Sequence, residues 1–168
     1  MDEGIRVVEA AQRGDRSAFG DLYARYWRTV RGIVMSRVPL IEVDDLVQEV
    51  FLSAMQRLTS LRDPAAFPAW LATIARNHAT DRLRRLMPTA ELNEDLALAD
   101  ADRTEALFIL SAIRNLPPAY GETLTLRLIE GMTGPEIAAR TGLTEGSVRV
   151  NLHRGMKLLR DRLERKPA

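Results

Sequence analysis

Apolar residues recur along this chain at the spacing of α-helices, and no stretch alternates convincingly between apolar and polar residues as a β-strand does. The sharpest pattern lies near the C-terminus. There Thr133 and Glu136 have the spacing of a helix capping box, Gly142 follows where the chain must turn, and Thr144 caps a second helix. The apolar stripe of that second helix consists of Val148, Leu152, Met156, Leu159 and Leu163. Two helices joined by a tight turn are therefore predicted over residues 133–163.

The outer face of the second helix is basic. Its members are Arg149, Val150, His153, Arg154 and Lys157. A cap, a turn glycine and a helix with a cationic face are typical of a helix-turn-helix, whose second helix enters the DNA major groove. The same pattern fits two ordinary helices with a solvated basic face. This segment alone leaves both interpretations open.

The N-terminal half of the chain predicts four helices. A short helix covers residues 3–13, and Asp15 caps a longer one in a region that Pro39 ends. Asp44 is expected to cap the third helix, and residues 67–86 form the fourth. The inward positions of the second helix are Phe19, Leu22, Tyr23, Tyr26, Val30 and Val34.

The third helix has two distinct faces. Its core face consists of Leu46, Val50, Phe51, Ala54 and Leu58. The opposite face is acidic and amide-bearing, and consists of Asp45, Gln48, Glu49, Leu52 and Gln56. Such a face is either a solvated surface with one leucine or a docking surface for a basic protein partner.

The fourth helix combines an aromatic residue with polar and basic ones. Its inward positions are Leu71, Ile74, Ala75 and His78, and we expect His78 to be a core or network histidine. Its outward positions are Thr73, Arg76, Asn77, Thr80 and Arg84, with Trp70 on the border. Rings that stack on unpaired bases, amides that read base edges and arginines that follow phosphates are typical of single-strand binding. The alternative is that Trp70 belongs to the core and the arginines are solvated.

Charge is distributed unevenly, although the net charge is only +1. Arginines dominate residues 76–85, acidic residues dominate 91–105, and basic residues again dominate 145–166. With further helices at about 103–115 and 118–130, this predicts an all-α fold. Its two small helical domains, residues 1–87 and 103–168, are joined by an acidic linker at 88–102, and the second carries the helix-turn-helix.

Composition excludes several classes of function. The chain has no cysteine, which rules out disulfides and thiolate metal sites and fits a reducing cytoplasm. Its charged N-terminus lacks the apolar core of a signal peptide, and no apolar run approaches the ~20 residues that span a bilayer. We therefore expect a cytoplasmic protein with no membrane insertion of its own. There is no phosphate-binding glycine loop or metal-ligand cluster either, so we expect no enzyme, cofactor or metal.

Three segments carry a family resemblance: DDLVQE, FPAWLATIARNHATDRLRR and LPPAYGETLTLRLIEGMTGPEIAARTGLTEGSVRVNLHRGMKLL. Together they resemble bacterial RNA polymerase sigma factors of the short, extracytoplasmic-function (ECF) class, which retain only regions 2 and 4. The resemblance runs from about residue 10 to residue 163 in the family's order. It implies a factor that binds core RNA polymerase, directs it to promoters and promotes strand opening. The implied partners are core RNA polymerase, promoter DNA and a cognate anti-sigma factor.

The resemblance also implies roles for residues. The acidic face with Asp45, Gln48, Glu49 and Leu52 corresponds to the surface that docks on the polymerase. The loop of Leu61, Arg62, Asp63 and Pro64 matches the segment that captures a flipped base of the −10 element. The face with Trp70, Thr73, Asn77 and Arg84 matches the grip on the melted strand. The basic face with Arg149, Val150, His153 and Arg154 matches the −35 contacts.

Two residues depart from the family pattern. Ser147 stands where threonine is usual, and Gly155 stands where alanine is common. Gly155 lowers helix propensity by about 1 kcal/mol relative to alanine and is expected to allow close packing. Two other functions stay open: a stand-alone helix-turn-helix regulator, and a sigma-like protein that has lost initiation and acts only as a binding partner.

Overall fold

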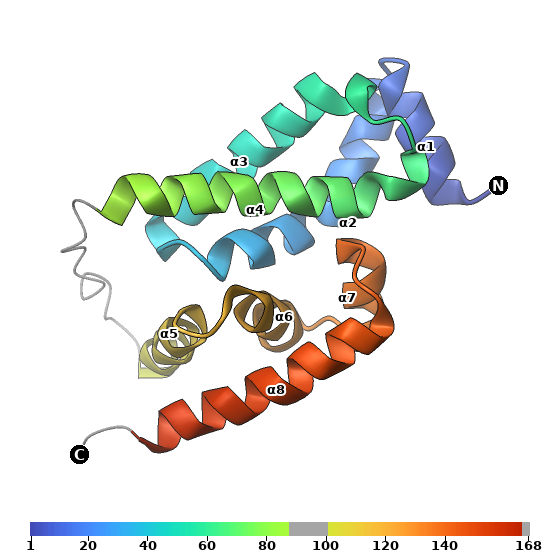
Figure 1. Cartoon of the computed structure of the whole chain (residues 1–168). Coiled ribbons are helices and arrows are strands. Elements are labelled where there is room, and N and C mark those ends of the chain that lie inside the picture. Colours follow the sequence, from blue (N-terminus) through green and yellow to red (C-terminus); the bar gives the residue numbers. More distant parts are fainter. Residues whose placement is uncertain (88–100, 166–168) are drawn as a thin grey trace.

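The computed structural model describes residues 1–87 and 101–165, with side chains from residue 105 onward in the second part. The described residues are helical, with two short 3-10 turns and no strand (Figure 1). The helices are α1 (Glu3–Gln12), α2 (Arg16–Met35), α3 (Leu40–Arg57), α4 (Phe67–Leu86), α5 (Ala101–Arg114), α6 (Pro118–Leu128), α7 (Gly134–Thr141) and α8 (Glu145–Glu164), and the 3-10 turns are η1 (Leu58–Ser60) and η2 (Pro64–Ala66). The all-α prediction is confirmed. Most of the predicted linker, at 88–102, lies outside the described residues, and its last two residues begin α5.

The first four helices form the N-terminal unit, in which α2 contacts α1, α3 and α4. Its core contains the predicted inward residues of α3 and α4, with only His78 partly exposed. One inward prediction for α2 is wrong, because Tyr23 is 41% exposed. The centroid of its ring lies 4.6 Å from that of the Phe51 ring, so the tyrosine covers the edge of the core rather than entering it.

Local caps explain where the N-terminal helices begin. The Asp15 carboxylate accepts hydrogen bonds from the backbone N–H groups of Ser17 (2.9 Å) and Ala18 (3.2 Å), as predicted. The predicted cap at Asp44 is wrong. Helix α3 begins four residues earlier, after Pro39, which has no capping side chain. Proline has a φ suited to a helix start and no N–H to satisfy, so α3 can begin there and Asp44 lies inside it.

Helices α5–α8 form the C-terminal unit, in which α6 contacts α5, α7 and α8. Thr133 and Glu136 form the predicted capping box at the start of α7, and Gly142 ends α7 with a φ of 76°. The Thr144 hydroxyl then accepts from the Ser147 backbone N–H at 3.1 Å. A Cβ on Gly155 would lie 3.1 Å from Leu124. The expected close packing at this glycine is therefore confirmed.

The capping box gives a stability prediction. Thr133→Ala should lower the free energy of unfolding by about 1 kcal/mol, because the N–H of Glu136 loses its acceptor. Urea unfolding would measure this, with Thr59→Ala as an exposed control. The Thr133 N–H also lowers the pKa of Glu136 by donating to its carboxylate. The stability that this second hydrogen bond, from the Thr133 N–H to the Glu136 carboxylate, contributes is therefore present at neutral pH and is lost as pH falls through that lowered pKa. A loss of stability no larger than in the control would contradict the role of the cap.

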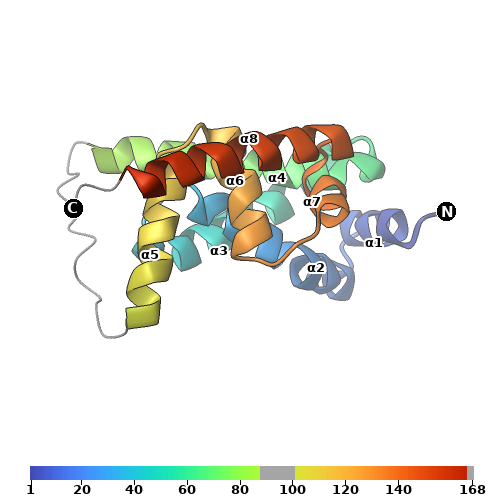
Figure 2. The same ribbon diagram turned by 90° about the horizontal axis from the view of Figure 1, so that it is seen from below.

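The two units pack directly against each other, with α2 against α6 and α4 against α7. A Cβ on Gly32 of α2 would lie 2.5 Å from the Leu126 side chain of α6. Likewise, a Cβ on Gly142 would lie 2.4 Å from the Cβ of Ala69 in α4. Helix α8 runs along the side of the molecule opposite α3, as the two orthogonal views show (Figures 1 and 2).

Candidate polymerase- and DNA-binding surfaces

The predicted docking face of α3 is an exposed stripe. Its five predicted members, Asp45, Gln48, Glu49, Leu52 and Gln56, are all exposed. Leu52 is 54% exposed, and the structure adds two apolar residues, Ile41 (80%) and Met55 (50%). These residues recur at helical spacing along one side of α3. The sequence prediction missed Ile41 because it began the helix at Asp44.

One member of this face, Glu49, forms an ion pair with a residue of α4. The Arg82 guanidinium donates to the Glu49 carboxylate at 2.7 Å and also bonds Glu42. These contacts raise the pKa of Arg82, chiefly through the hydrogen bond to Glu42 and then through the bond to Glu49. Arg82 was not among the predicted site residues, since only the tertiary structure brings α4 beside α3. The pair fixes the position of Glu49, whereas Asp45 forms no ion pair within the described part of the chain.

The loop before α4 is anchored at both ends. Leu61 is buried, and its carbonyl accepts a hydrogen bond from the Gln12 side chain at 2.8 Å. The Asp63 carboxylate accepts from the Ala65 N–H at 3.0 Å and so caps η2 before Pro64. Arg62 is exposed at the tip. This loop is therefore rigid, and of its four predicted site residues it presents Arg62 and Asp63 to solvent while Leu61 holds it in place.

The predicted strand-binding face of α4 is mostly open. Thr73, Asn77, Thr80 and Arg84 are exposed. Trp70 is only partly buried, and its ring lies 5.9 Å from that of Phe67. The two interpretations of this residue therefore combine: the indole packs on the core edge and leaves part of its surface available.

Arg76 lies on the same face, but its guanidinium is hydrogen-bonded to a residue of the C-terminal unit. Its guanidinium donates to the Glu122 carboxylate in a two-pronged contact, with Nη2 to Oε1 at 2.7 Å and Nε to Oε2 at 2.9 Å. The hydrogen bond to Glu122 raises the pKa of Arg76. No local sequence pattern indicates this pair, because the two residues lie on α4 and α6, 46 positions apart.

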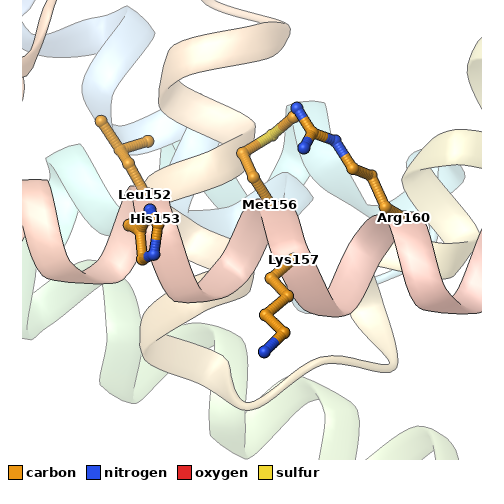
Figure 3. Close-up of a pocket in the computed structure, with 5 residues that line it drawn as sticks. All are labelled: Leu152, His153, Met156, Lys157 and Arg160. Atoms are coloured by element: carbon orange, nitrogen blue, oxygen red, sulfur yellow. The ribbon is translucent and has the colours of Figure 1, made fainter.

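The basic face of α8 is exposed to solvent. Arg149, Val150, His153, Arg154 and Lys157 are all exposed. Within the described residues, none of the cationic members forms an ion pair. Next to this face a surface pocket of about 480 Å³ is lined by Leu152, His153, Met156, Lys157 and Arg160 (Figure 3). Unpaired guanidinium and imidazole groups on a rigid helix suit contacts with phosphates and base edges.

Comparison with known proteins identifies the family. The models of sigma-70 region 2 and sigma-70 region 4 match residues 22–88 and 109–159. The ECF RNA polymerase sigma-E factor of Escherichia coli K12 is 31% identical over 177 residues, which cover 94% of this chain and 93% of that protein. The chain belongs to the ECF sigma factors. This membership does not fit a stand-alone helix-turn-helix regulator.

Two further relatives agree with this membership. The ECF RNA polymerase sigma factor BldN of Streptomyces coelicolor is 34% identical over 92% of this chain, which spans 64% of the length of BldN. The solved structure of CnrH, in complex with the cytosolic domain of CnrY, is 28% identical with a TM-score of 0.69 and covers 99% of this chain and 100% of that one. The helical architecture of this ECF sigma factor therefore matches that of a solved relative along nearly its whole length.

Two further features are absent from the described residues of this sigma factor. They contain no cluster of three or more histidine, aspartate or glutamate side chains that could hold a metal ion. No helix among them is long and apolar enough to cross a membrane.

Proposed function

We propose that this sigma factor binds core RNA polymerase through the exposed stripe on α3 and directs it to promoters. The observation that carries the proposal is the stripe itself, with three apolar residues, Ile41, Leu52 and Met55, exposed beside acidic ones. Exposed apolar side chains rimmed by polar ones are typical of protein–protein interaction surfaces. In this proposal residues 1–87 act as region 2, residues 103–168 act as region 4, and residues 88–102 connect them.

The faces of α4 and α8 supply the DNA contacts. The tip of the 61–64 loop, Trp70 and the polar side chains of α4 hold the melted −10 strand, and the basic face of α8 reads the −35 element. A sigma factor needs no reaction of its own. It binds strand-separated DNA better than the duplex, so opening is favoured by mass action. Capture of an extruded base offsets part of the unstacking cost, which is a few kcal/mol.

A second protein partner belongs to the proposal. The relative CnrH was solved in complex with the cytosolic domain of CnrY. We propose that a cognate anti-sigma factor likewise binds this chain and controls its access to polymerase. Co-purification of the chain from its source, followed by mass spectrometry, would identify that factor.

Run-off transcription tests the function directly. The purified chain is added to core RNA polymerase from the source bacterium, on promoters recovered by sequencing the transcripts that its overexpression induces. We expect initiation that depends on the added chain. Binding to core polymerase without initiation on any recovered promoter would favour the alternative of a sigma-like protein that acts only as a binding partner.

Arg149→Ala tests the assignment of α8. The guanidinium is exposed near the start of the helix and offers paired donors to guanine or phosphate. Loss of one good base contact should weaken discrimination at one −35 position by about 1–3 kcal/mol. Run-off assays on single-base −35 variants would measure this, with exposed Arg165→Ala as the control at the far end of α8. Unchanged preference at every −35 base would refute the assignment.

A further inference from the structure

Helix α1 lies beside the 61–64 loop, which the proposed function assigns to the capture of a −10 base. It contacts both 3-10 turns that flank this loop, η1 before it and η2 after it (Figure 1). The match to the model of sigma-70 region 2 begins at residue 22, so α1 precedes the matched segment. A role for α1 therefore has to come from its own contacts.

Gln12 makes the polar contacts between α1 and the loop. It is the last residue of α1, and its side-chain Nε2 donates to the Leu58 carbonyl at 3.1 Å and to the Leu61 carbonyl at 2.8 Å. A primary amide carries two N–H groups, so one side chain can serve both ends of the turn. Backbone carbonyls that no helix satisfies need such a partner where they are partly shielded from water.

The position of Gln12 is fixed by its own helix. Val8, one helical turn earlier, and Ala11, the residue before it, are buried in the same core as Leu61. Directly after α1, Gly14 turns the chain with a φ of 93°. Gln12 therefore contacts the loop from a packed corner between α1 and α2.

The tether lies next to the loop residues that face solvent. Arg62 and Asp63 are exposed, and they follow Leu61 directly. On their other side, the Asp63 carboxylate accepts from the Ala65 N–H at 3.0 Å. The exposed tip thus lies between a local cap and the side chain of Gln12, which comes from a separate helix.

A loop that is ordered before binding selects its ligand better than one that becomes ordered during binding. Each residue that binding immobilises costs conformational entropy, and that cost reduces the affinity. Recognition of an unstacked base also depends on donors and acceptors at fixed positions along its edges. Loosening the loop should therefore weaken the choice of base more than it weakens the general attraction for DNA.

We propose that Gln12 is a positioning residue for base capture, because its amide holds the Leu58 and Leu61 carbonyls and so keeps the loop tip in one conformation. Gln12 does not touch the base and acts through the loop backbone. Helix α1 is then part of the unit that reads the −10 element. This inference rests on the proposed function, because a base is captured only if the chain acts as a sigma factor.

Three variants of the full chain separate a positioning role from a merely structural contact. Gln12→Met keeps the length of the side chain and removes both donors, whereas Gln12→Lys keeps a donor group that can serve two carbonyls. The matched control is Glu3→Met, which replaces a side chain of the same shape at the exposed other end of α1. Far-UV circular dichroism and thermal unfolding check that each variant folds.

Backbone hydrogen exchange is the first readout, and it needs neither polymerase nor DNA. The N–H groups of Leu61 and Ala66 are hydrogen-bonded within the loop region. In Gln12→Met we expect them to exchange about tenfold faster, because the turn loses two hydrogen bonds. Exchange in α8 should stay the same, and Gln12→Lys and Glu3→Met should resemble the unchanged chain. Unaltered exchange at both positions in Gln12→Met would overturn the tether.

Base discrimination by the holoenzyme is the second readout. Holoenzyme assembled with each variant is titrated with single-stranded −10 oligonucleotides that carry each base, or no base, at one position at a time. The captured position is the one at which base removal weakens binding to the unchanged holoenzyme most.

At the captured position, Gln12→Met should reduce the preference for the favoured base by about five- to tenfold, as for the loss of one hydrogen bond. Preferences at the other −10 positions and affinity for core polymerase should stay the same. Gln12→Lys should restore most of the preference, and Glu3→Met should leave it unchanged.

Two results would overturn the positioning role. If Gln12→Met loosened the loop without altering base preference, Gln12 would be only a structural contact of α1. If preference fell equally at every −10 position, or fell in Glu3→Met as well, the cause would be general destabilisation. If the unchanged holoenzyme showed no base preference at any −10 position, base capture would fail and the positioning role with it, whereas hydrogen exchange would still show whether Gln12 holds the loop.

Discussion

A Leu52→Asp variant is expected to lose binding to core RNA polymerase by at least roughly thirtyfold, as for removal of an interface hot spot worth about 2 kcal/mol. Leu52 lies at the centre of the exposed α3 stripe, between Ile41 and Met55. A carboxylate there would replace the apolar contact of the leucine with a charge that has to lose water on binding. Because the side chain is half exposed, we expect the fold to tolerate the change.

The measurement is a titration of labelled core polymerase with the purified chain. Leu158→Asp on α8 makes the same substitution at another exposed leucine and serves as the control. Equal unfolding midpoints for both variants would separate binding from folding. If Leu52→Asp bound core polymerase as tightly as the control, the docking face would have to lie elsewhere.

The second large effect concerns promoter opening. Asn77→Ala and Trp70→Ala should each reduce the fraction of open promoter by about tenfold. Trp70→Ala removes a ring on which an unpaired base stacks, which contributes about 1–3 kcal/mol per base, and Asn77→Ala removes an amide that hydrogen-bonds a base edge. Affinity for core polymerase should be unchanged, because neither residue lies on α3. Permanganate reactivity of unpaired thymines measures the opening.

Three comparisons sharpen this test. Trp70→Phe keeps a ring against Phe67 and should retain much of the opening, whereas Asn115→Ala is an exposed control in the C-terminal unit. A template with a pre-melted bubble at the −10 element should restore transcription to a variant that fails only at melting. Loss of core binding by either alanine variant would count against the separate assignment of the α3 and α4 faces.

The sequence was most informative where structure depends on near neighbours. Capping boxes, turn glycines and apolar stripes act over three or four positions, so Thr133, Gly142 and Thr144 could be assigned from the sequence alone. The same local rules failed where two signals competed. Asp44 was chosen as a cap, but Pro39 also permits a helix start and α3 begins after it. That choice left Ile41 out of the predicted docking face.

Exposed site residues were predictable for the same reason. A residue opposite the apolar stripe of an amphipathic helix faces solvent, and the predicted polar members of α3, α4 and α8 do so with the exception of Arg76. Tyr23 shows the limit of this rule: its position on the stripe favours burial, yet the ring lies at the edge of the core, partly exposed against Phe51.

The sequence by itself determined the helices, their faces and the charge of each face, because periodicity, caps and turn residues act within one element. The tertiary structure decided how the two units meet. In the sequence Glu122 is one acid in a predicted helix, and Arg76 is predicted to lie on the outward, strand-binding face of its helix beside Asn77. Only the packing of α6 against α2 and of α7 against α4 brings them to 2.7 Å and buries the carboxylate. Charges so far apart in the sequence interact strongly only when the fold removes the water between them.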